Sequence, residues 1–584
     1  MRKTKIVCTL GPATDVSGVL KKLIINGMNV ARLNFSHGSF EEHQKRIDSI
    51  KKIRKELNVP VGLMLDTKGP EIRIRDFAKN EVELKQGQIF TLTTRDIIGD
   101  ENIVSVTYDG LPKDVVRGNR ILIDDGLIEL HVLSTDNTEI KCEVKNGGKI
   151  GNKKGVNVPC VAIRLPYISE KDHNDVLFAI ENDFEFIAAS FARTAEDIIG
   201  IRKILELNNG KSIQIIAKIE NSEGVENIDD ILRVSDGIMV ARGDMGVEIA
   251  LEELPIIQKM LIKKCYEAGK PVITATQMLD SMIRNPRPTR AETTDVANAI
   301  YDGTSAIMLS GETAVGKYSI EAVQTMARIA RRAEKAIDYK KAFAITQFNV
   351  TPNVRNAICH ATVTTAHGLE AKAIISVTLS GHTARMVSKF RPSCPIIATT
   401  VSKKVYQQLS ISWGVIPVLC EIKQTTDELF DQAVDKAVET GLVQNGDLVV
   451  MSAGIPVGVS GTTNILKVHI IGNVLVSGTG ANKLRISGNI CVAKTNEQVL
   501  KEFCEGDILV IKTTDNELLP IMKKASGIIT EEEGPTSHAA IVGLAIDIPV
   551  ITGAKGCVHI LKSGTTVTID AAKGLVYSGV VKNI

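Results

Sequence analysis

Eight short apolar runs constrain the fold of this chain more than any other feature. Each run ends in polar or glycine residues, and amphipathic segments typical of helices lie between them. The runs cover residues 5–11, 29–38, 61–70, 186–191, 213–220, 237–244, 271–279 and 306–313. Strands that alternate with helices lie parallel, because parallel neighbours need a long crossover connection. Eight such units favour a closed (β/α)8 barrel of the α/β class, a TIM barrel, although an open doubly wound sheet also fits the alternation.

One long segment interrupts this alternation between the third and fourth runs. Residues 70–167 carry short stretches of alternating apolar and polar residues, separated by turn signals such as Asp-Asp-Gly and Gly-Gly-Lys. This pattern predicts a small inserted β domain with antiparallel, barrel-like strands. An insertion at the carboxyl end of a barrel strand lies on the catalytic face, so we expect it to act as a lid. The barrel then comprises residues 1–69 and 168–345.

The alternation of strands and helices restarts beyond the barrel. Residues 346–473 predict a C-terminal α/β domain, and residues 474–584 a further C-terminal domain. The glycine-rich string at 472–484 is typical of a linker between the two. A chain of 584 residues is long enough for three or four domains.

Composition excludes several classes of function. The 70 basic and 68 acidic residues leave a net charge of +2, which gives no electrostatic reason to expect a nucleic-acid or membrane partner. The ten cysteines include no Cys-x-x-Cys pair of the zinc-ribbon kind. Since the sequence shows neither a signal-peptide pattern nor an apolar run of membrane-spanning length, we expect a cytoplasmic protein with reduced thiols.

Polar residues gather where the predicted strands end, and barrel chemistry takes place at these carboxyl ends. Any one of them alone is commonly a helix cap or an ion-pair partner. Together they form a group of candidates: Arg32, Asn34, Ser36, Asp66, Thr67, Lys68, Lys218, Glu220, Arg242, Asp244, Thr276, Gln277 and Glu312.

Two carboxylates within this group predict a metal site. Glu220 and Asp244 end consecutive strands, and hard carboxylate oxygens with room for water suit Mg²⁺ or Mn²⁺. Arg32 and Lys218 add the positive charge that a phosphate or carboxylate substrate needs. The residues on their own predict a Mg²⁺-assisted reaction on a small anionic substrate, and they favour a phosphorylated one.

Six long motifs make the chain resemble the pyruvate kinases over about residues 1–473. They are IAKIENSEG, MVARGDMGVEI, ITATQMLDSM, NVARLNFSHG, LDTKGPEIR and NKKGVNVP. The resemblance implies transfer of the phosphoryl group of phosphoenolpyruvate to ADP, giving ATP and pyruvate, the last step of glycolysis. Such a reaction gathers negative charge at the site, which must therefore be rich in cations.

The resemblance also implies roles for individual residues of the predicted rim. Glu220 and Asp244 match the divalent-metal ligands, and Lys218 matches the lysine that stabilises the transferring phosphoryl group and the enolate. Thr276 matches the threonine on the proton-delivery route. Arg32 is similar to the arginine that contacts the phosphoryl group.

Further matches concern the substrate carboxylate, a potassium ion and the nucleotide. The backbone at Ala241, Arg242 and Gly243 would hold the substrate carboxylate. The nucleotide-binding residues would be Asn34, Arg73 and Lys154. The K⁺ ligands would be Asn34, Ser36, Asp66 and Thr67.

Two single positions refine these expectations. Family members that need K⁺ carry glutamate where this chain has Glu71, which implies K⁺ dependence. Cys160 stands where the family motif has glycine, and we expect little effect from this change.

A hydroxyl-rich turn in the C-terminal α/β domain predicts an effector site. Main-chain amides at a helix start bind phosphate well when hydroxyls accompany them, although an ordinary helix cap has the same composition. The resemblance implies an allosteric sugar-phosphate pocket, closed by the loop 452–464. Fructose bisphosphate, ribose 5-phosphate and AMP are the alternatives, of which AMP and ribose 5-phosphate are favoured. The turn comprises Thr378, Ser380, Gly381, His382 and Thr383.

The last region resembles the swivelling phosphohistidine domain of enzymes that use phosphoenolpyruvate. It carries the Thr-Ser-His-Ala-Ala core with His538, but Glu533 replaces a glycine of the usual motif. A structural or regulatory role is favoured over phosphotransfer through His538. A dikinase-type phosphotransferase and a protein that only binds ligands are the competing hypotheses. The family is commonly homotetrameric.

Overall fold

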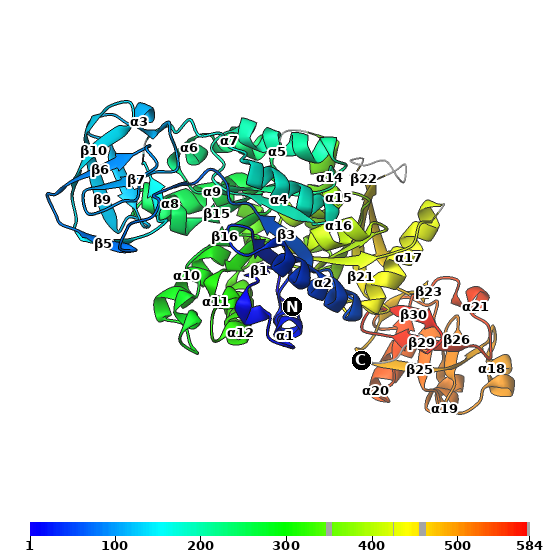
Figure 1. The fold of residues 1–584 in the computed structure, drawn as a ribbon. Coiled ribbons are helices and arrows are strands. Elements are labelled where there is room, and N and C mark those ends of the chain that lie inside the picture. The colour runs from blue at the N-terminus through cyan, green and yellow to red at the C-terminus, as the bar shows by residue number, and fades with distance from the viewer. Residues whose placement is uncertain (160, 346–352, 424, 455–462, 473, 581–584) are drawn as a thin grey trace. The chain divides into compact units, whose positions relative to one another are not determined.

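The structure is a computed structural model that describes residues 1–584 except 160, 346–352, 424, 455–462, 473 and 581–584 (Figure 1). The chain divides into two compact units. The first unit comprises residues 1–363, 376–426 and 452–465, and the second comprises residues 364–375, 427–451 and 466–584.

Eight parallel strands close into a barrel in the first unit. Their order around the barrel is β1-β17-β16-β15-β14-β13-β3-β2, and every neighbouring pair is parallel. The closed barrel is confirmed and the open sheet is excluded. The strands are β1 (Lys5–Thr9), β2 (Val30–Asn34), β3 (Gly62–Asp66), β13 (Phe186–Ala189), β14 (Gln214–Ile219), β15 (Gly237–Ala241), β16 (Val272–Ala275) and β17 (Ala306–Leu309).

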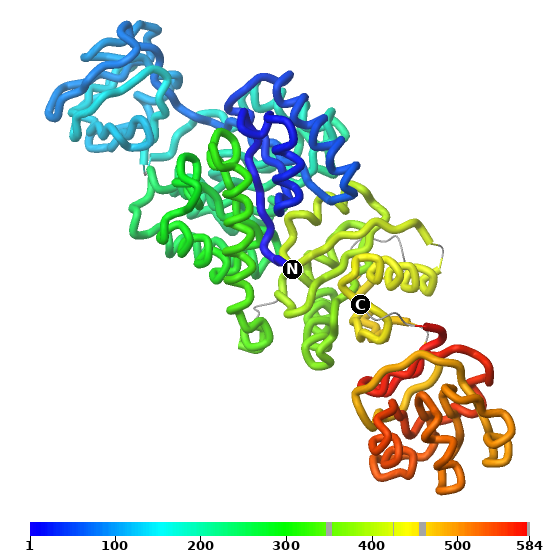
Figure 2. The backbone as a smooth tube through the Cα atoms, turned by 90° about the horizontal axis from the view of Figure 1, so that it is seen from below, coloured from blue at the N-terminus to red at the C-terminus, as the bar shows by residue number. Residues whose placement is uncertain are grey.

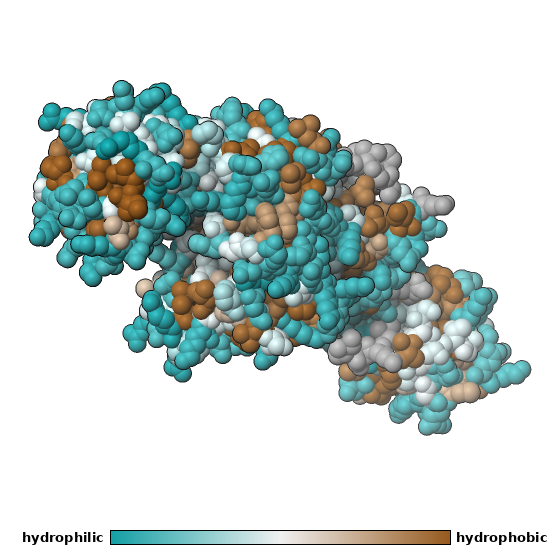
Figure 3. All heavy atoms as spheres, in the orientation of Figure 1, coloured by the Kyte–Doolittle hydropathy of each residue, from teal (hydrophilic) through white to brown (hydrophobic). Residues whose placement is uncertain are grey.

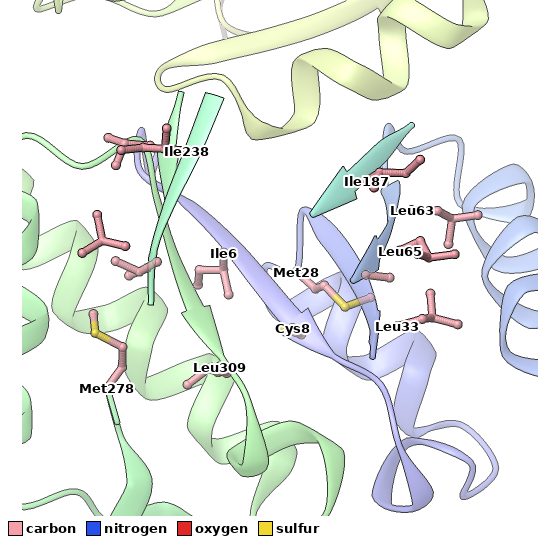
Figure 4. Close-up of a cluster of buried hydrophobic side chains, with 14 of the residues drawn as sticks. Ile6, Cys8, Met28, Leu33, Leu63, Leu65, Ile187, Ile238, Met278 and Leu309 are labelled. Atoms are coloured by element: carbon pink, nitrogen blue, oxygen red, sulfur yellow. The ribbon is translucent and has the colours of Figure 1, made fainter. Parts of the chain in front are cut away.

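These strands are continuously apolar because both of their faces are buried. Alternate residues point to opposite faces, so Val7 fills the barrel interior while Ile6 and Cys8 pack against the surrounding helices. Figure 4 shows part of the outer layer, in which Leu33, Leu63 and others occupy the space between strands and helices.

Long helices cover the outside of the barrel, and their first turns carry side-chain caps. Ser39, Ser169, Thr194 and Thr289 each accept a hydrogen bond from a backbone N–H three residues on, which fixes where each helix starts. The helices are α1 (Val19–Asn26), α2 (Phe40–Glu56), α4 (Glu170–Glu181), α5 (Ala195–Leu207), α7 (Ile228–Val234), α9 (Leu254–Ala268), α10 (Arg290–Tyr301) and α12 (Ser319–Ala336).

The inserted segment forms a β domain, seen in Figure 2 as a lobe joined to the barrel by two chain segments. Its larger sheet has the order β4-β12-β8-β9-β10-β6-β7, and β11 (Gly148–Gly151) pairs with β5 (Glu81–Leu84) in a smaller sheet. Most pairs are antiparallel as expected, but β6 and β7 are parallel. The strands of the larger sheet are β4 (Ile72–Arg73), β6 (Ile89–Thr93), β7 (Ile103–Ser105), β8 (Arg120–Ile123), β9 (Ile128–Thr135), β10 (Glu139–Val144) and β12 (Gly155–Asn157).

A five-stranded sheet follows the barrel, with the strand order β20-β19-β18-β21-β22. Its strands are β18 (Ala373–Val377), β19 (Ile396–Thr400), β20 (Val415–Leu419), β21 (Leu448–Gly454) and β22 (Thr463–Ile470). The accompanying helices are α14 (Val354–Gly368), α15 (His382–Lys389), α16 (Lys403–Gln408) and α17 (Thr426–Glu439). The predicted α/β character of this region is confirmed.

The prediction of a linker at 472–484 is wrong. Within this string, β23 (Val474–Ser477) pairs with β30 (Leu575–Ser578), and β24 (Thr479–Gly480) pairs with β28 (Val550–Thr552). Glycine serves close packing here, since a Cβ on Gly480 would lie 1.5 Å from the carbonyl oxygen of Ala571.

The final sheet to which these strands belong has eight strands in the order β23-β30-β29-β25-β26-β27-β28-β24. Its remaining members are β25 (Arg485–Val492), β26 (Ile508–Ile511), β27 (Gly527–Thr530) and β29 (Thr566–Asp570).

No helix within the described residues is long and apolar enough to cross a membrane. On the face drawn in Figure 3, hydrophobic residues form separate groups among hydrophilic ones. Scattered apolar exposure of this kind is normal for a protein surface.

Candidate active site

Three strand ends bring opposite charges together at the rim of the barrel. Asp66, at the end of β3, accepts a hydrogen bond from Arg32 Nε at 2.5 Å and one from Lys218 Nζ at 3.0 Å. The same ammonium lies 3.1 Å from Glu220 Oε1. All four side chains are buried, so each charge depends on its neighbours rather than on water.

The central carboxylate of this group stays ionised. Burial alone would raise the pKa of Asp66, but Arg32 and Lys218 outweigh burial and hold that pKa below its usual value. Burial would likewise lower the pKa of Lys218, but Asp66 and Glu220 raise it above the ordinary value. A charged lysine is therefore fixed beside a charged aspartate at the rim.

Glu220 is the one member of the group whose ionisation is costly. Burial, with a smaller contribution from Asp244, raises its pKa to about 8 although Lys218 opposes the shift. Its Oε2 accepts the Phe191 N–H at 2.6 Å. A cation beside Glu220 and Asp244 would favour the ionised form of both.

The donor set at this rim fits a hard divalent ion. Across the described part of the chain, no three His, Cys, Asp or Glu side chains converge as a ready-made metal cluster. Glu220 and Asp244, which interact electrostatically, would supply two oxygen ligands and leave the other positions to water and substrate. Mg²⁺ prefers that arrangement, since it keeps several waters and is held by few carboxylates.

A cleft with about 100 Å³ of enclosed space opens to solvent beside this charged group. Barrel residues Asp244 and Glu248 line one side, and Glu71, Asp125 and Asn157 of the inserted domain or its junction line the other. Asn157 Nδ2 donates to Glu248 Oε1 at 3.3 Å, which links the two sides directly. A substrate in this cleft would touch both domains.

The end of β16 holds strained backbone. Thr276 has φ +68° and Gln277 has φ +54°, both in the left-handed region that costs energy for residues other than glycine. Thr276 Oγ1 accepts the Gly243 N–H at 2.7 Å, and Arg242 donates to the Thr276 carbonyl oxygen at 2.7 Å. The start of α8 (Arg242–Glu248), with Ala241 as its cap, is thereby tied to the threonine.

Other predicted residues lie on the same rim. Asn34 and Asp66 are register partners in β2 and β3, and Asn34 Oδ1 accepts the Ser36 N–H at 3.1 Å. Thr67 Oγ1 accepts the N–H of Ser190 at 3.1 Å. These contacts gather the oxygens of the predicted K⁺ ligands near the ends of two adjacent strands.

The predicted nucleotide contacts are engaged in ion pairs. Arg73 lies 2.7 Å from Glu71, and Lys154 lies 3.0 Å from Asp124. Cys160 is outside the described residues. Glu312, a strand-end candidate, accepts the backbone N–H of Leu279 and of Ser310, so its contacts stabilise the local backbone.

Sequence reasoning missed Ser190. Its Oγ accepts a hydrogen bond from Lys218 at 2.8 Å and lies 3.0 Å from Asp66 Oδ1 and 2.6 Å from the Thr67 carbonyl oxygen. The signal was its position, because it follows β13 at the carboxyl end where every neighbouring strand also delivers a polar residue. Thr9, at the end of β1, was missed for the same reason and accepts from Arg32 at 2.8 Å.

The predicted effector turn lies before α15 in the first unit. Gly381 has φ +76°, and Thr383 Oγ1 lies 2.7 Å from Thr463 Oγ1. His382 Nε2 lies 2.8 Å from Arg355 Nη1, and burial together with Arg355 lowers the pKa of His382 to about 4. Part of the loop 452–464, at 455–462, is outside the described residues.

The histidine of the second unit begins helix α20 (His538–Ala545). Its Nδ1 lies 3.0 Å from Thr514 Oγ1, and the side chain is half-buried.

The barrel, its inserted domain and the charged rim define a class of protein: a (β/α)8-barrel enzyme suited to phosphoryl transfer. Comparison with known proteins narrows the class. Family models match residues 1–323 (pyruvate kinase, barrel domain), 356–469 (pyruvate kinase, alpha/beta domain) and 503–574 (PEP-utilising enzyme, mobile domain).

Individual relatives agree over nearly the whole chain. The chain is 52% identical over 581 residues to the pyruvate kinase of Bacillus licheniformis, covering 99% of both chains. It is 51% identical over 580 residues to that of Geobacillus stearothermophilus, again covering 99% of both. A crystal structure of a pyruvate kinase from Cryptosporidium parvum matches with a TM-score of 0.77 and 42% identity, covering 80% of this chain and 96% of that one. The chain belongs to the pyruvate kinase family.

Ser190→Ala tests whether the missed hydroxyl positions Lys218. Without it the ammonium keeps its carboxylate partners but loses one fixed contact, so turnover of phosphoenolpyruvate and ADP should fall by about 10- to 100-fold. The measurement is the steady-state rate together with a thermal unfolding curve.

Ser235→Ala is the matched control, because Ser235 Oγ is buried with no hydrogen-bond partner among the described residues. Equal rates in both variants would show that Ser190 has no positioning role.

Proposed function

We propose that this chain transfers the phosphoryl group of phosphoenolpyruvate to ADP, giving ATP and pyruvate, as the last step of glycolysis. The observation that carries the proposal is the buried group of Arg32, Lys218 and Asp66 beside Glu220. This group places two cations next to a carboxylate at the rim of the barrel, and the nearby cleft is lined by Asp244 of the same rim. Membership of the family supports the reaction itself.

The positive charge acts in the step in which the bond between the bridging oxygen and phosphorus of phosphoenolpyruvate breaks. As the phosphorus forms its bond to a terminal oxygen of ADP, negative charge grows on the enolate oxygen and on the phosphoryl oxygens. Lys218 stabilises both, and Arg32 contacts the phosphoryl group. Glu220 and Asp244 would hold Mg²⁺ or Mn²⁺, which would supply electrostatic stabilisation of developing negative charge.

Thr276 would act in the second half of the reaction, when the enolate carbon gains a proton. Its hydroxyl lies at the rim, bonded to the Gly243 N–H and the Ala275 carbonyl oxygen. The backbone at Ala241, Arg242 and Gly243 would hold the substrate carboxylate. The strained φ of Thr276 keeps the hydroxyl close to these amides.

A monovalent cation and the nucleotide complete the proposed site. K⁺ would be bound by the side chains of Asn34, Ser36, Asp66 and Thr67, with Glu71 nearby in the cleft. Asn34, Arg73 and Lys154 would contact the nucleotide phosphates, and the inserted domain carries the last two of them.

Regulation and assembly are proposed from the resemblance. A phosphorylated metabolite, AMP or ribose 5-phosphate, would bind at Thr378, Ser380, Gly381, His382 and Thr383. We also propose a homotetramer in the cytoplasm. The proposed domains comprise residues 1–69 and 168–345, 70–167, 346–473 and 474–584.

Lys218→Met tests the central role. Removing the ammonium should lower turnover by at least about 1,000-fold, since an electrostatic stabiliser of the transition state is lost. Mn²⁺ binding, measured by electron paramagnetic resonance, should persist because Glu220 and Asp244 are intact.

Lys263→Met is the matched control, as Lys263 has a side chain that is 75% exposed. Near-normal turnover of Lys218→Met would refute the assignment.

Glu71→Lys tests K⁺ dependence. The wild-type chain should lose most of its activity when tetramethylammonium replaces K⁺, and the lysine variant should keep activity because its ammonium substitutes for the monovalent charge. The measurement is turnover as a function of K⁺ at constant ionic strength. Full wild-type activity without K⁺ would contradict the proposal.

Ser380→Asp tests the effector turn. A carboxylate at this position should repel a phosphate, so activation by AMP or ribose 5-phosphate should need at least about tenfold more effector. The initial rate is measured at low phosphoenolpyruvate with each effector in turn. Ser49→Asp, on the exposed side of α2, is the control, and unchanged activation of Ser380→Asp would argue against this pocket.

A further inference from the structure

A second cleft lies in the first unit, at the opposite end of the barrel strands from the active site. Gly269, Lys270 and Pro271 come just before β16, and Ser305 comes just before β17, so the cleft lies at the amino ends of these strands. Its other wall comes from the segment at 385–413. The cleft is narrow, with about 20 Å³ of enclosed space, and is open to solvent on one side.

The lining of this cleft is strongly cationic. Lys270, Arg385, Lys389 and Arg391 line it, and the lining contains no acidic residue. Burial lowers the pKa of Lys270, Arg385 and Lys389, and lowers that of Arg391 to about 10. The folded chain thus carries positive charge there at a cost that a bound anion would remove.

Structural contacts explain part of this charge. Lys270 donates to the Ser235 carbonyl oxygen at 2.6 Å just beyond α7, Lys389 donates to the Glu267 carbonyl oxygen near the end of α9, and Arg391 donates to the Gly303 carbonyl oxygen at 2.6 Å beyond α10. Cations are favourable at helix carboxyl ends. The ammonium of Lys270 is fully engaged, because it also donates to the carbonyl oxygens of Leu232 and Arg233. The guanidinium groups, in contrast, use only some of their donors.

Buried guanidinium donors are left over. Nε and Nη1 of Arg391 and Nη1 of Arg385 are buried and have no hydrogen-bond partner among the described residues. Leaving such donors unsatisfied costs about 1–3 kcal/mol each, and more for charged groups. An acceptor that is absent from the chain itself would satisfy them.

Glu267 is the carboxylate that acts on Lys389, and it lies 4.0 Å from the exposed Lys263. Two other neighbouring carboxylates are engaged elsewhere. Asp236 lies 2.7 Å from Arg202, and Glu334 accepts the backbone N–H groups of Lys3 and Thr4. Both influence the cleft only from outside its lining.

We propose that this cleft binds the phosphate group of a small phosphorylated metabolite, at a site separate from the turn at residues 378–383. Planar guanidinium groups with free N–H donors match phosphate oxygens, and lysines add charge for a dianion. Arg385 would connect the two places, because its Nη2 donates to the Ser380 carbonyl oxygen at 2.9 Å. Phosphate in the cleft would therefore stabilise one arrangement of the turn.

The chain carries its own reporter for this site. Trp413 is the single tryptophan of the sequence, it lines the cleft, and the Arg391 guanidinium lies 4.5 Å from its ring centre. We would titrate the full chain with inorganic phosphate, replacing chloride at constant ionic strength, and follow tryptophan emission. A saturable change is expected, and its absence would overturn the proposal.

Variants locate the bound phosphate. Lys389→Gln and, independently, Arg385→Met should each raise the half-saturating phosphate concentration at least about tenfold. Lys263→Gln, an exposed lysine on α9, should titrate like the wild type. Wild-type titration curves in both cleft variants would overturn the proposal.

Two further measurements separate this site from those proposed above. Thr383→Val removes a hydroxyl from the effector turn and should leave the emission titration unchanged; a loss comparable to that of Lys389→Gln would place the phosphate at the turn and overturn the proposal. Turnover without effector should persist in Lys389→Gln. If the wild type did not transfer the phosphoryl group, the proposed function would be refuted, but a saturable change in tryptophan emission would still show that the cleft binds phosphate.

Discussion

The rim of the barrel depends on one buried carboxylate, Asp66, held between Arg32 and Lys218. Removing one partner from a buried ion pair costs about 3–5 kcal/mol, because the remaining charge is left uncompensated. Two cations share this aspartate, and Ser190 and Glu220 add further contacts to the lysine. The two cations are therefore held in place at the rim before any substrate binds. Phosphoryl transfer requires this kind of preorganised charge.

The barrel and most of its rim could be predicted from the sequence, because buried parallel strands leave an unmistakable alternation and polar residues stand out where apolar runs end. Ser190 was missed because a serine after an apolar run resembles an ordinary turn residue, and only its place at the end of a barrel strand indicates a role. The prediction of a linker at 472–484 was wrong because glycine occurs both in flexible segments and where the backbone packs closely. Only the structure shows that Gly480 packs against Ala571. The parallel pairing of β6 and β7 depends on contacts between strands that composition does not encode.

The two ends of the barrel differ in how their cations are neutralised. At the carboxyl ends, Asp66 and Glu220 balance the cations. At the amino ends, Lys270, Lys389 and Arg391 mainly meet carbonyl oxygens of helix ends, whose partial charges neutralise them incompletely. The same fold thus holds one balanced and one unbalanced cationic region.

The hydrogen bond from the Gly243 N–H to Thr276 Oγ1 has a consequence for how tightly substrate is held. A carboxylate that accepts a hydrogen bond from this N–H must first displace the threonine hydroxyl. Part of its interaction energy is therefore offset by the loss of the existing hydrogen bond. In the chain as it stands, this hydrogen bond keeps the amide satisfied. A substrate carboxylate bound at this amide would be held less tightly than a count of its contacts suggests, and it would leave faster, because the threonine hydroxyl is in position to accept the N–H again.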